Sequence, residues 1–195
     1  MEKLDVRNQY DNCHEVYGSN RISQDELSNT VFHAAIDFGL KGKKLLDVGC
    51  GNGSDLRILA DQGASVYGVD PSEGFLNTAR ELNPNGVLKN GVGEDLPFED
   101  GVFDVVVSKW AIQTSFEVPK ALAEIARVLK KDGMLVLLSK HPLRQWIERV
   151  RDYGHGINYY EQVVVTSNIF GGQIRLQEPT HTSGDYFNST FFKNF

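Results

Sequence analysis

Apolar stretches of strand length alternate with amphipathic helical stretches through the central part of the chain. Their spacing predicts strands near residues 43–48, 65–69, 86–89, 103–108 and 134–139. Between and after them it predicts helices near residues 54–62, 72–82 and 118–130. Since alternating strands and helices build a parallel sheet covered on both faces, we predict an α/β fold with a doubly wound, mostly parallel, Rossmann-like sheet.

The pattern changes after Pro142. A helix is expected over residues 143–153, followed by two apolar segments that flank Gly171 and Gly172, a turn signal for a β-hairpin. Residues 182–185 are suited to cap a final helix, whose aromatic side chains need a surface to cover them. We therefore expect a C-terminal lid or hairpin attached to the sheet.

Composition is that of an ordinary globular domain. A chain of 195 residues with 41% hydrophobic and 24% charged residues is long enough for one domain with a substantial core. The formal charge of −6 and the isoelectric point near 5.4 argue against a nucleic-acid backbone as the main partner, which favours a basic patch.

The sequence gives no sign of targeting or metal chemistry. The first residues lack an apolar segment typical of a signal peptide, and no apolar run approaches the ~20 residues that span a membrane. Cys13 and Cys50 belong to no disulfide framework or metal-ligating cluster. We therefore expect a cytoplasmic protein with no membrane contact and no metal site.

A glycine-rich loop follows the first predicted strand. Gly49, Gly51 and Gly53 let the backbone turn sharply and lie against a ligand, which the next helix faces with its free N–H groups. A dinucleotide fingerprint would place its third glycine one position later, at Ser54. Asp47 would repel a pyrophosphate and suits a cationic group. The loop therefore favours a nucleoside that bears positive charge over NAD.

Residues 46–53, Leu-Asp-Val-Gly-Cys-Gly-Asn-Gly, resemble the first motif of class I S-adenosylmethionine-dependent methyltransferases. Later segments agree in order: 66–72 resembles the second strand with its terminal acid, 93–98 and 103–108 resemble the adenine loop and fourth strand, and 121–138 resembles the helix, turn and fifth strand that follow. The match runs from about Lys43 to Pro142, half of the chain. The later region looks like the small-molecule, type 11-like branch.

This resemblance implies S-adenosylmethionine as cofactor, S-adenosylhomocysteine as product and a small-molecule acceptor. It divides the chain into a cofactor-binding core with an N-terminal cap helix, residues 1–142, and a lid and acceptor-binding extension of the same domain, residues 143–195. The residues that it implies as cofactor contacts are Tyr10, Arg21, Asp47, Gly49, Cys50, Gly51, Gly53, Asp70, Pro71, Val92, Gly93, Glu94 and Ser108.

The three acidic residues among these expected cofactor contacts have alternative roles. Asp70 ends a strand 21 positions after Gly49, where a carboxylate can accept both ribose hydroxyls, or it is only a turn acid before the next helix. Asp47 supports the methionine portion of the cofactor, or it is a buried acid that holds the loop. The family often has Asp where this chain has Val92, and that Asp binds the adenine amino group. In this chain a backbone contact or Glu94 would have to bind adenine instead. The alternative is that Glu94 is a solvated loop acid.

Tyr10, Tyr17 and Arg21 precede the first long helix, which a capping box at residues 23–26 is expected to begin. In the family this segment often covers the cofactor, and an arginine can clamp its carboxylate because guanidinium geometry suits a bidentate contact. A lone surface arginine is the alternative for Arg21.

Candidate catalytic residues are few. His141 follows the fifth predicted strand and could remove a proton from the acceptor, or it is a loop histidine that packs or caps. His181 is similar, and no nucleophilic triad is visible. Methyl transfer by in-line displacement needs little more than a held acceptor, because proximity can supply ~7–11 kcal/mol of barrier reduction. A dedicated base is therefore not required.

The acceptor, the methylated atom and the oligomeric state stay open. Candidate walls of the acceptor pocket are Trp110, Trp146, Tyr159, Tyr160 and Phe170, although aromatic residues there are as often plain core. The family usually closes its sheet with two further strands, and the sequence leaves open whether these are missing or whether the hairpin or a partner completes the fold. A cofactor-binding module without activity and an NAD(P)-dependent oxidoreductase are the two rival functions.

Overall fold

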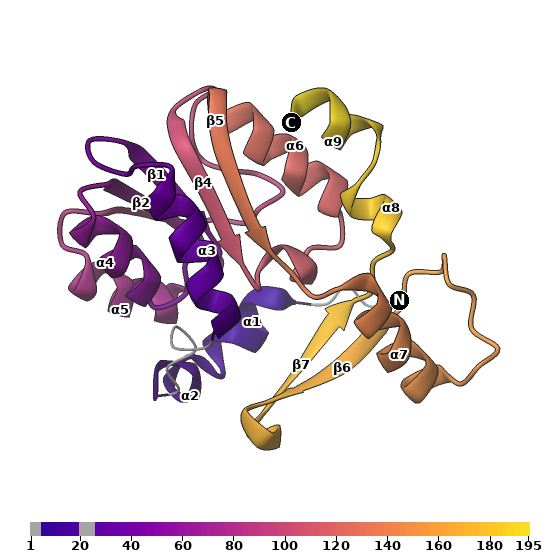
Figure 1. Ribbon diagram of the computed structural model, residues 1–195. Helices are drawn as coiled ribbons and strands as arrows, with labels where there is room; N and C mark the ends of the chain where they lie inside the picture. Colours follow the sequence, from indigo (N-terminus) through magenta and orange to yellow (C-terminus); the bar gives the residue numbers. More distant parts are fainter. Residues whose placement is uncertain (1–4, 20–25) are drawn as a thin grey trace.

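The computed structural model describes residues 5–19 and 26–195. Its centre is a five-stranded sheet in which every strand pairs parallel with its neighbours (Figure 1). The strands, in spatial order, are β3 (Val87–Asn90), β2 (Ser65–Asp70), β1 (Lys44–Val48), β4 (Phe103–Lys109) and β5 (Leu129–Leu138). The chain order reverses at β1, which makes the carboxyl ends of β1 and β4 the topological switch point where ligands bind in such sheets.

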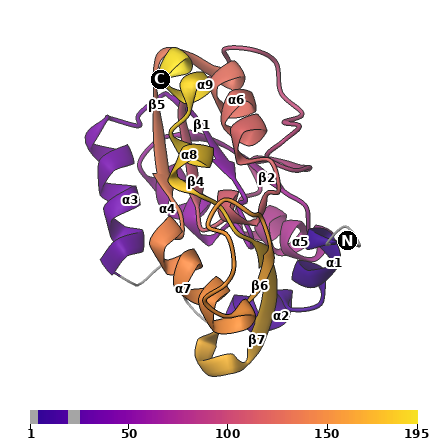
Figure 2. The ribbon, with the colours of Figure 1, turned by 90° about the vertical axis from the view of Figure 1, so that its right-hand side faces the viewer.

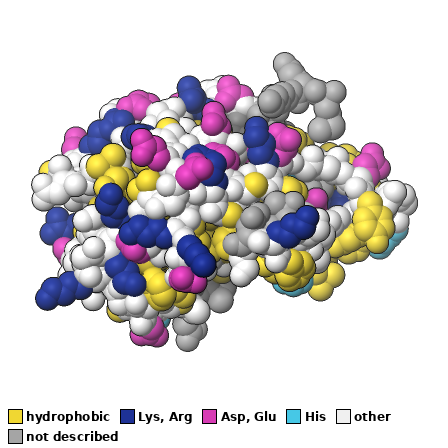
Figure 3. Space-filling view, turned by 90° about the horizontal axis from the view of Figure 1, so that it is seen from above, with side chains coloured by type: hydrophobic (Ala, Val, Ile, Leu, Met, Phe, Trp, Pro, Cys, Tyr) yellow, Lys and Arg dark blue, Asp and Glu magenta, His cyan; other side chains and the backbone are white. Residues whose placement is uncertain are grey.

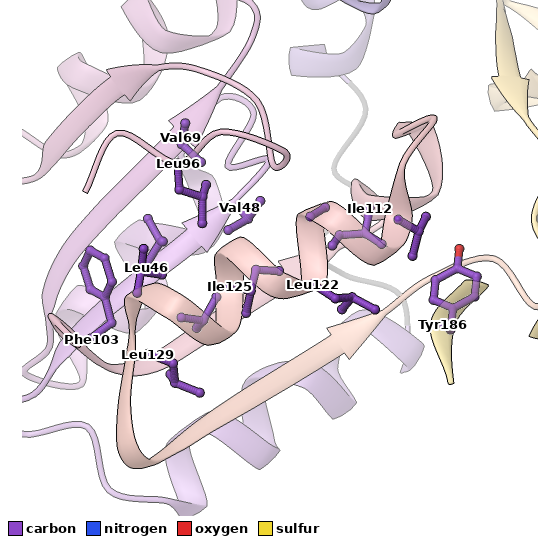
Figure 4. Close-up of a cluster of buried hydrophobic side chains, with 14 residues drawn as sticks. Leu46, Val48, Val69, Leu96, Phe103, Ile112, Leu122, Ile125, Leu129 and Tyr186 are labelled. Atoms are coloured by element: carbon purple, nitrogen blue, oxygen red, sulfur yellow. The ribbon is translucent and has the colours of Figure 1, made fainter. Parts of the chain in front are cut away.

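Helices cover both faces of this sheet, as the sequence predicts (Figure 2). On one face lie α3 (Glu26–Asp37), α4 (Ser54–Asp61) and α5 (Glu73–Leu82), which bury apolar side chains with alternate residues of β1, β2 and β4. On the other face lies α6 (Val118–Val128). Its apolar stripe, Val118, Leu122 and Ile125, packs against Leu46 and the remaining core shown in Figure 4.

The fifth strand differs from its predicted bounds. The helix expected to reach residue 130 ends at Val128, and Leu129 already has extended backbone and pairs with Phe103. A bulge then shifts the register, and Asp132 turns the chain with φ of 64°. β5 therefore begins before the Lys-Asp-Gly turn, because pairing with β4 outweighs the local helical pattern.

Residues 142–179 form a second, smaller layer. α7 (Pro142–Tyr153) leads to a two-stranded antiparallel sheet of β6 (Val164–Ile169) and β7 (Ile174–Pro179), joined by a short 3₁₀ turn, η3 (Phe170–Gly172). Gly171 and Gly172 have φ of 67° and 89°, left-handed values that glycine adopts freely, which confirms the predicted hairpin turn. The hairpin does not join the main sheet, so β5 is an edge strand among the described residues.

The expected C-terminal helix is two helices, α8 (Ser183–Tyr186) and α9 (Ser189–Asn194). Asn188 separates them, because its side-chain oxygen accepts the backbone N–H of Phe191 at 3.0 Å and so begins a new helix. Both helices lie against α6, and Tyr186 is buried in the core cluster of that face (Figure 4). Phe187 and Phe192 stay exposed.

The short helices α1 (Val6–Asp11) and α2 (His14–Ser19), α7 and the hairpin all lie at the end of the molecule toward which β4 and β5 point (Figure 1). The view from above shows acidic and basic side chains interspersed (Figure 3). Within residues 5–19 and 26–195, no helix combines the length and the apolar character needed to cross a membrane.

Candidate cofactor and active site

The glycine loop after β1 has the backbone that its sequence predicts. Gly49, Gly51 and Gly53 all have left-handed φ, at 81°, 52° and 76°. A Cβ on Gly49 would lie 2.2 Å from that of Ala111, so this position admits no side chain. A Cβ on Gly51 would meet no atom within 4 Å. Gly51 therefore faces open space at the carboxyl end of the sheet, where a ligand can approach the backbone.

Asp70, at the end of β2, is buried and holds this loop in place. One carboxylate oxygen accepts the N–H of Gly51 and the other accepts that of Ser72, each at 2.9 Å. Burial raises its pKa to about 6, against the lowering effect of the two backbone N–H groups. Each carboxylate oxygen can accept a second hydrogen bond, so the turn role and ribose binding are compatible.

Asp47, on β1, is 3% exposed, and its Oδ1 has no hydrogen-bond partner among the described residues. Burial raises its pKa to about 8; the charge of Asp55 adds to this rise, Lys109 opposes it, and Asp70 adds a smaller rise. An unpartnered buried polar atom is costly and calls for a ligand or another explanation. The loop-holding alternative leaves this oxygen unexplained.

We expect Asp47→Asn to gain stability relative to the unmodified chain as pH rises. The folded-state pKa lies above the unfolded value of ~3.9, so the stability that Asp47 contributes is complete below that value and is lost as pH rises through 8. The difference in melting temperature between the two proteins should therefore grow from pH 5 to pH 8 and then level off. A constant difference from pH 5 to pH 9 would show that Asp47 ionises normally.

Beside Asp47 lies an ion pair that the sequence analysis missed. Lys109 Nζ, at the end of β4, lies 2.5 Å from Asp55 Oδ2 in the first turn of α4, and both side chains are largely buried. The ammonium group also lies 5.0 Å from the centre of the Phe32 ring. In the sequence, the only local sign of this ion pair was Asp55 itself, an acid in the first turn of the helix that follows the glycine loop.

On the adenine side of the expected site, the loop after β3 carries Val92, whose side chain is exposed and whose carbonyl accepts the N–H of Asp95 at 3.2 Å. Glu94 accepts a hydrogen bond from Ser115 Oγ at 2.5 Å, next to the 3₁₀ turn η2 (Ile112–Thr114). Glu94 is therefore not the solvated acid of the alternative interpretation. Its prediction as an adenine contact, like those of Val92 and Gly93, stays a prediction.

Ser108 is fully buried and donates to the carbonyl of Val48 at 2.9 Å. Its hydroxyl therefore ties β4 to β1, and its contact with the cofactor stays a prediction. Cys50 is also buried, and a Cβ added to Gly68 would lie 2.8 Å from its sulfur, so β2 needs a glycine where it packs against the loop. Pro71 precedes α5 in the turn after Asp70.

The N-terminal helix α1 lies over the start of α5. Asp11 accepts hydrogen bonds from Ser72 Oγ and, at 3.4 Å, from the N–H of Gly74. The Tyr10 ring lies 6.3 Å from that of Phe75. The structure thus brings α1 beside the turn that follows Asp70, and the contact of Tyr10 with the cofactor stays a prediction. Arg21 lies outside the described residues, as does most of the predicted capping box at residues 23–26.

The structure gives His141 the alternative role of a cap. It is exposed, and its Nδ1 accepts the N–H of Leu143 at 3.1 Å at the start of α7. A neutral ring with an accepting Nδ1 carries its proton on Nε2, so neither nitrogen has a free lone pair for a proton. His181 is buried, with Nε2 3.1 Å from the carbonyl of Gln113, and burial lowers its pKa.

A largely buried polar cluster joins α7 and the hairpin to the segment that follows β5. Lys140 Nζ bonds Ser167 Oγ at 2.6 Å and pairs with Glu178, on β7, and with Glu148 of α7 at 3.2 Å. The hairpin also reaches α1, because the amide of Gln9 bonds both the N–H and the carbonyl of Gln177. Residues far apart in sequence thus close around the carboxyl end of the sheet, and periodicity gave no signal for either contact.

Known proteins agree with this fold. Residues 46–137 match a family model described as a methyltransferase domain. The ubiquinone/menaquinone biosynthesis C-methyltransferase of Campylobacter jejuni is 34% identical over 122 residues, which cover 58% of this chain and 52% of that protein. Demethylmenaquinone methyltransferase of Symbiobacterium thermophilum is 41% identical over 107 residues, covering 50% and 42%. The chain spans about half of the length of these curated relatives.

Solved structures extend the likeness beyond the matched segment. An S-adenosylmethionine-dependent methyltransferase from Mesorhizobium loti has a TM-score of 0.68 at 20% identity, with 88% of this chain and 81% of that chain covered. At this identity the likeness concerns the fold. Together with the family match, it means that residues 46–137 are similar to a methyltransferase domain and that the chain has the fold of a solved S-adenosylmethionine-dependent methyltransferase.

Proposed function

We propose that this chain transfers a methyl group from S-adenosylmethionine to a small-molecule acceptor. The observation that carries the proposal is the pairing, at one end of the sheet, of an open glycine with an unpartnered buried acid. Gly51 leaves room for a ligand against the backbone, and Asp47 Oδ1 lacks a donor among the described residues. The family match of residues 46–137 supports this assignment over an oxidoreductase.

The residues present fit the cofactor. Asp70 has accepting capacity for ribose hydroxyls, and its two N–H bonds fix the carboxylate beside Gly51. Asp47 would receive the α-ammonium group, which would satisfy Oδ1 and favour the ionised carboxylate. The start of α4 would face the remaining polar atoms.

When bound, S-adenosylmethionine supplies a methyl group already activated by the positive charge of its sulfonium. The protein's part is to hold the acceptor in line and to exclude water. α1 and β7 lie across the carboxyl end of the sheet and are joined through Gln9 and Gln177. Since His141 caps α7, we assign no dedicated base and attribute the rate to proximity.

Residues 143–195 would form the lid and the acceptor wall. Trp110 adopts a left-handed φ of 58° at the end of β4, an uncommon conformation for a bulky residue and one often found at functional sites. Trp146 and Tyr159 stack edge to face with ring centres 5.5 Å apart. Because the curated relatives are named for quinone synthesis, quinone-type rings are the first acceptors to test. The cytoplasmic location stays a prediction.

A cofactor-binding module without catalytic activity is the second candidate. The capping role of His141 favours it, since this histidine was the leading candidate for a base. Saturable binding of S-adenosylmethionine with no turnover of any acceptor in a quinone and small-molecule panel would support the module. Formation of S-adenosylhomocysteine that depends on an added acceptor would support the enzyme.

Isothermal titration tests the cofactor directly. We expect S-adenosylmethionine and S-adenosylhomocysteine to bind saturably and NAD to give no heat of binding, because Ser54 stands where a dinucleotide fingerprint needs its third glycine and Asp47 suits an ammonium. Adenosine serves as a control that has the ribose and adenine but lacks the methionine portion. Saturable NAD binding with no response to the other two ligands would defeat the proposal.

A further inference from the structure

Charged side chains gather on one face of the sheet at the carboxyl ends of β1 and β4. Asp47 pairs in register with Val107 of β4, and Lys109 follows two residues later. Since strand side chains alternate between faces, Asp47, Val107 and Lys109 share the face that α3 and α4 cover. Asp55 enters the same space from the first turn of α4.

The cluster holds two acids and one base. Lys109 Nζ bonds Asp55 at 2.5 Å, with the two side chains 11% and 15% exposed. Asp47 Oδ1 is left without a partner among the described residues. Lys109 and Asp55 therefore share an ion pair, yet their charges act on Asp47 in opposite senses: the ammonium favours its ionised form and the carboxylate opposes it.

Other elements packed around Asp47 contribute less. β2 places Asp70 nearby, whose negative charge also opposes ionisation of Asp47. The loop after β1 carries the Cys50 thiol, whose pKa is raised well above its ordinary value by burial first and then by the charges of Asp70 and Asp47. α3 contributes the uncharged ring of Phe32 beneath Lys109. Lys109 is thus the described cation that acts most directly on Asp47.

We propose that Lys109 and Asp55 are positioning residues that set the charge of Asp47 and, through it, the affinity for the cationic end of S-adenosylmethionine. The inference rests on the proposed function, because cofactor binding is one of its readouts. With a pKa near 8, Asp47 is ionised in about a tenth of molecules at pH 7. A ligand that needs the ionised form binds with an apparent affinity reduced by that fraction.

The two partners of one ion pair should therefore have opposite effects. Removing the ammonium in Lys109→Met raises the pKa of Asp47, and a rise of about one unit makes S-adenosylmethionine binding about tenfold weaker at pH 7. Removing the carboxylate in Asp55→Asn lowers that pKa, and a fall of about one unit makes binding about fivefold tighter. If the ion pair only stabilised the fold, both variants would weaken binding.

Calorimetric titration of S-adenosylmethionine into both variants and the unmodified chain, at pH values from 6 to 8.5, tests this directly. Ionisation of the ligand itself affects all three titrations equally. Differences in affinity between the three proteins therefore report changes in the protein. Lys109→Arg keeps the charge and should retain the unmodified pH profile. Affinity changes of the same sign in Lys109→Met and Asp55→Asn, or none in either, would overturn the inference.

A second measurement needs no cofactor. Each variant is compared with its double variant carrying Asp47→Asn, and the difference in unfolding stability is followed from pH 5 to pH 10. The pH at which this difference levels off reports the pKa of Asp47 and should move up in Lys109→Met and down in Asp55→Asn. Opposite shifts support the inference even if S-adenosylmethionine does not bind, which would refute only the proposed function. Equal or absent shifts refute the inference alone.

Discussion

Gly51→Val should abolish binding of S-adenosylmethionine and S-adenosylhomocysteine while the protein still folds. A Cβ at this position meets no protein atom within 4 Å, so the β-branched side chain would fill the space assigned to the ligand. The left-handed φ of 52° adds strain of roughly 1–2 kcal/mol in a non-glycine residue. Titration calorimetry measures the loss, and circular dichroism shows that the sheet persists.

Gly101→Val is the matched control for this substitution. Gly101 also has a left-handed φ, 63°, and a Cβ there also meets nothing within 4 Å. It differs from Gly51 in its place, because it precedes β4 and so lies at the amino end of the strands, opposite the glycine loop. We expect a similar fall in melting temperature with unchanged affinity. Retained affinity in Gly51→Val would place the ligand elsewhere, and equal losses of affinity in both variants would attribute the effect to strain.

Asp70→Ala should weaken cofactor binding by more than tenfold. Two charge-assisted hydrogen bonds to the ribose, at ~1.5–3 kcal/mol each, would be lost together with the N–H contacts that hold Gly51 and Ser72. Because the pKa of Asp70 is raised to about 6, affinity of the unmodified protein should also fall as pH drops below this value. Asp70→Asn keeps the shape and one carbonyl acceptor and should show an intermediate loss.

Asp104→Ala separates this effect from general destabilisation. Asp104 also ties two strands, since it accepts the N–H of Lys44 at 2.9 Å and pairs with Lys130, but it lies at the amino end of β4. We expect reduced stability and unchanged affinity. Normal affinity in Asp70→Ala with a normal melting profile would leave Asp70 as a turn acid only.

Local sequence was sufficient for the order of strands and helices in the core. Strand and helix periodicities differ, so the unbroken apolar run at 134–138 and the stripe of Val118, Leu122 and Ile125 each predict one element. The glycine loop could be predicted for a similar reason, because left-handed backbone at Gly49 and Gly51 requires the residue itself. These features are encoded within a few consecutive residues.

The site was predicted less completely. Asp47 and Asp70 were identified because each ends or nearly ends a strand beside the loop. Lys109 and Asp55 were missed, since their ion pair joins β4 to α4 across 54 positions that no periodicity relates. The role of His141 as a cap depends on the N–H of Leu143, and therefore on where α7 begins.

The sequence by itself determined the secondary-structure order, the glycine loop and the resemblance of residues 46–53 to the first motif of methyltransferases. Only the tertiary structure decided which face of α7 is buried: Gln145, Glu148 and Arg149 lie inside, while Leu143 and Ile147 are exposed. The reason is that the inner face meets polar partners outside the helix: Lys140 and the carbonyls of residues 158–159 on the segments that flank it, and the carbonyl of Pro179, which lies 34 positions after Gln145. A helical pattern fixes spacing, whereas the partners that a face meets depend on long-range packing.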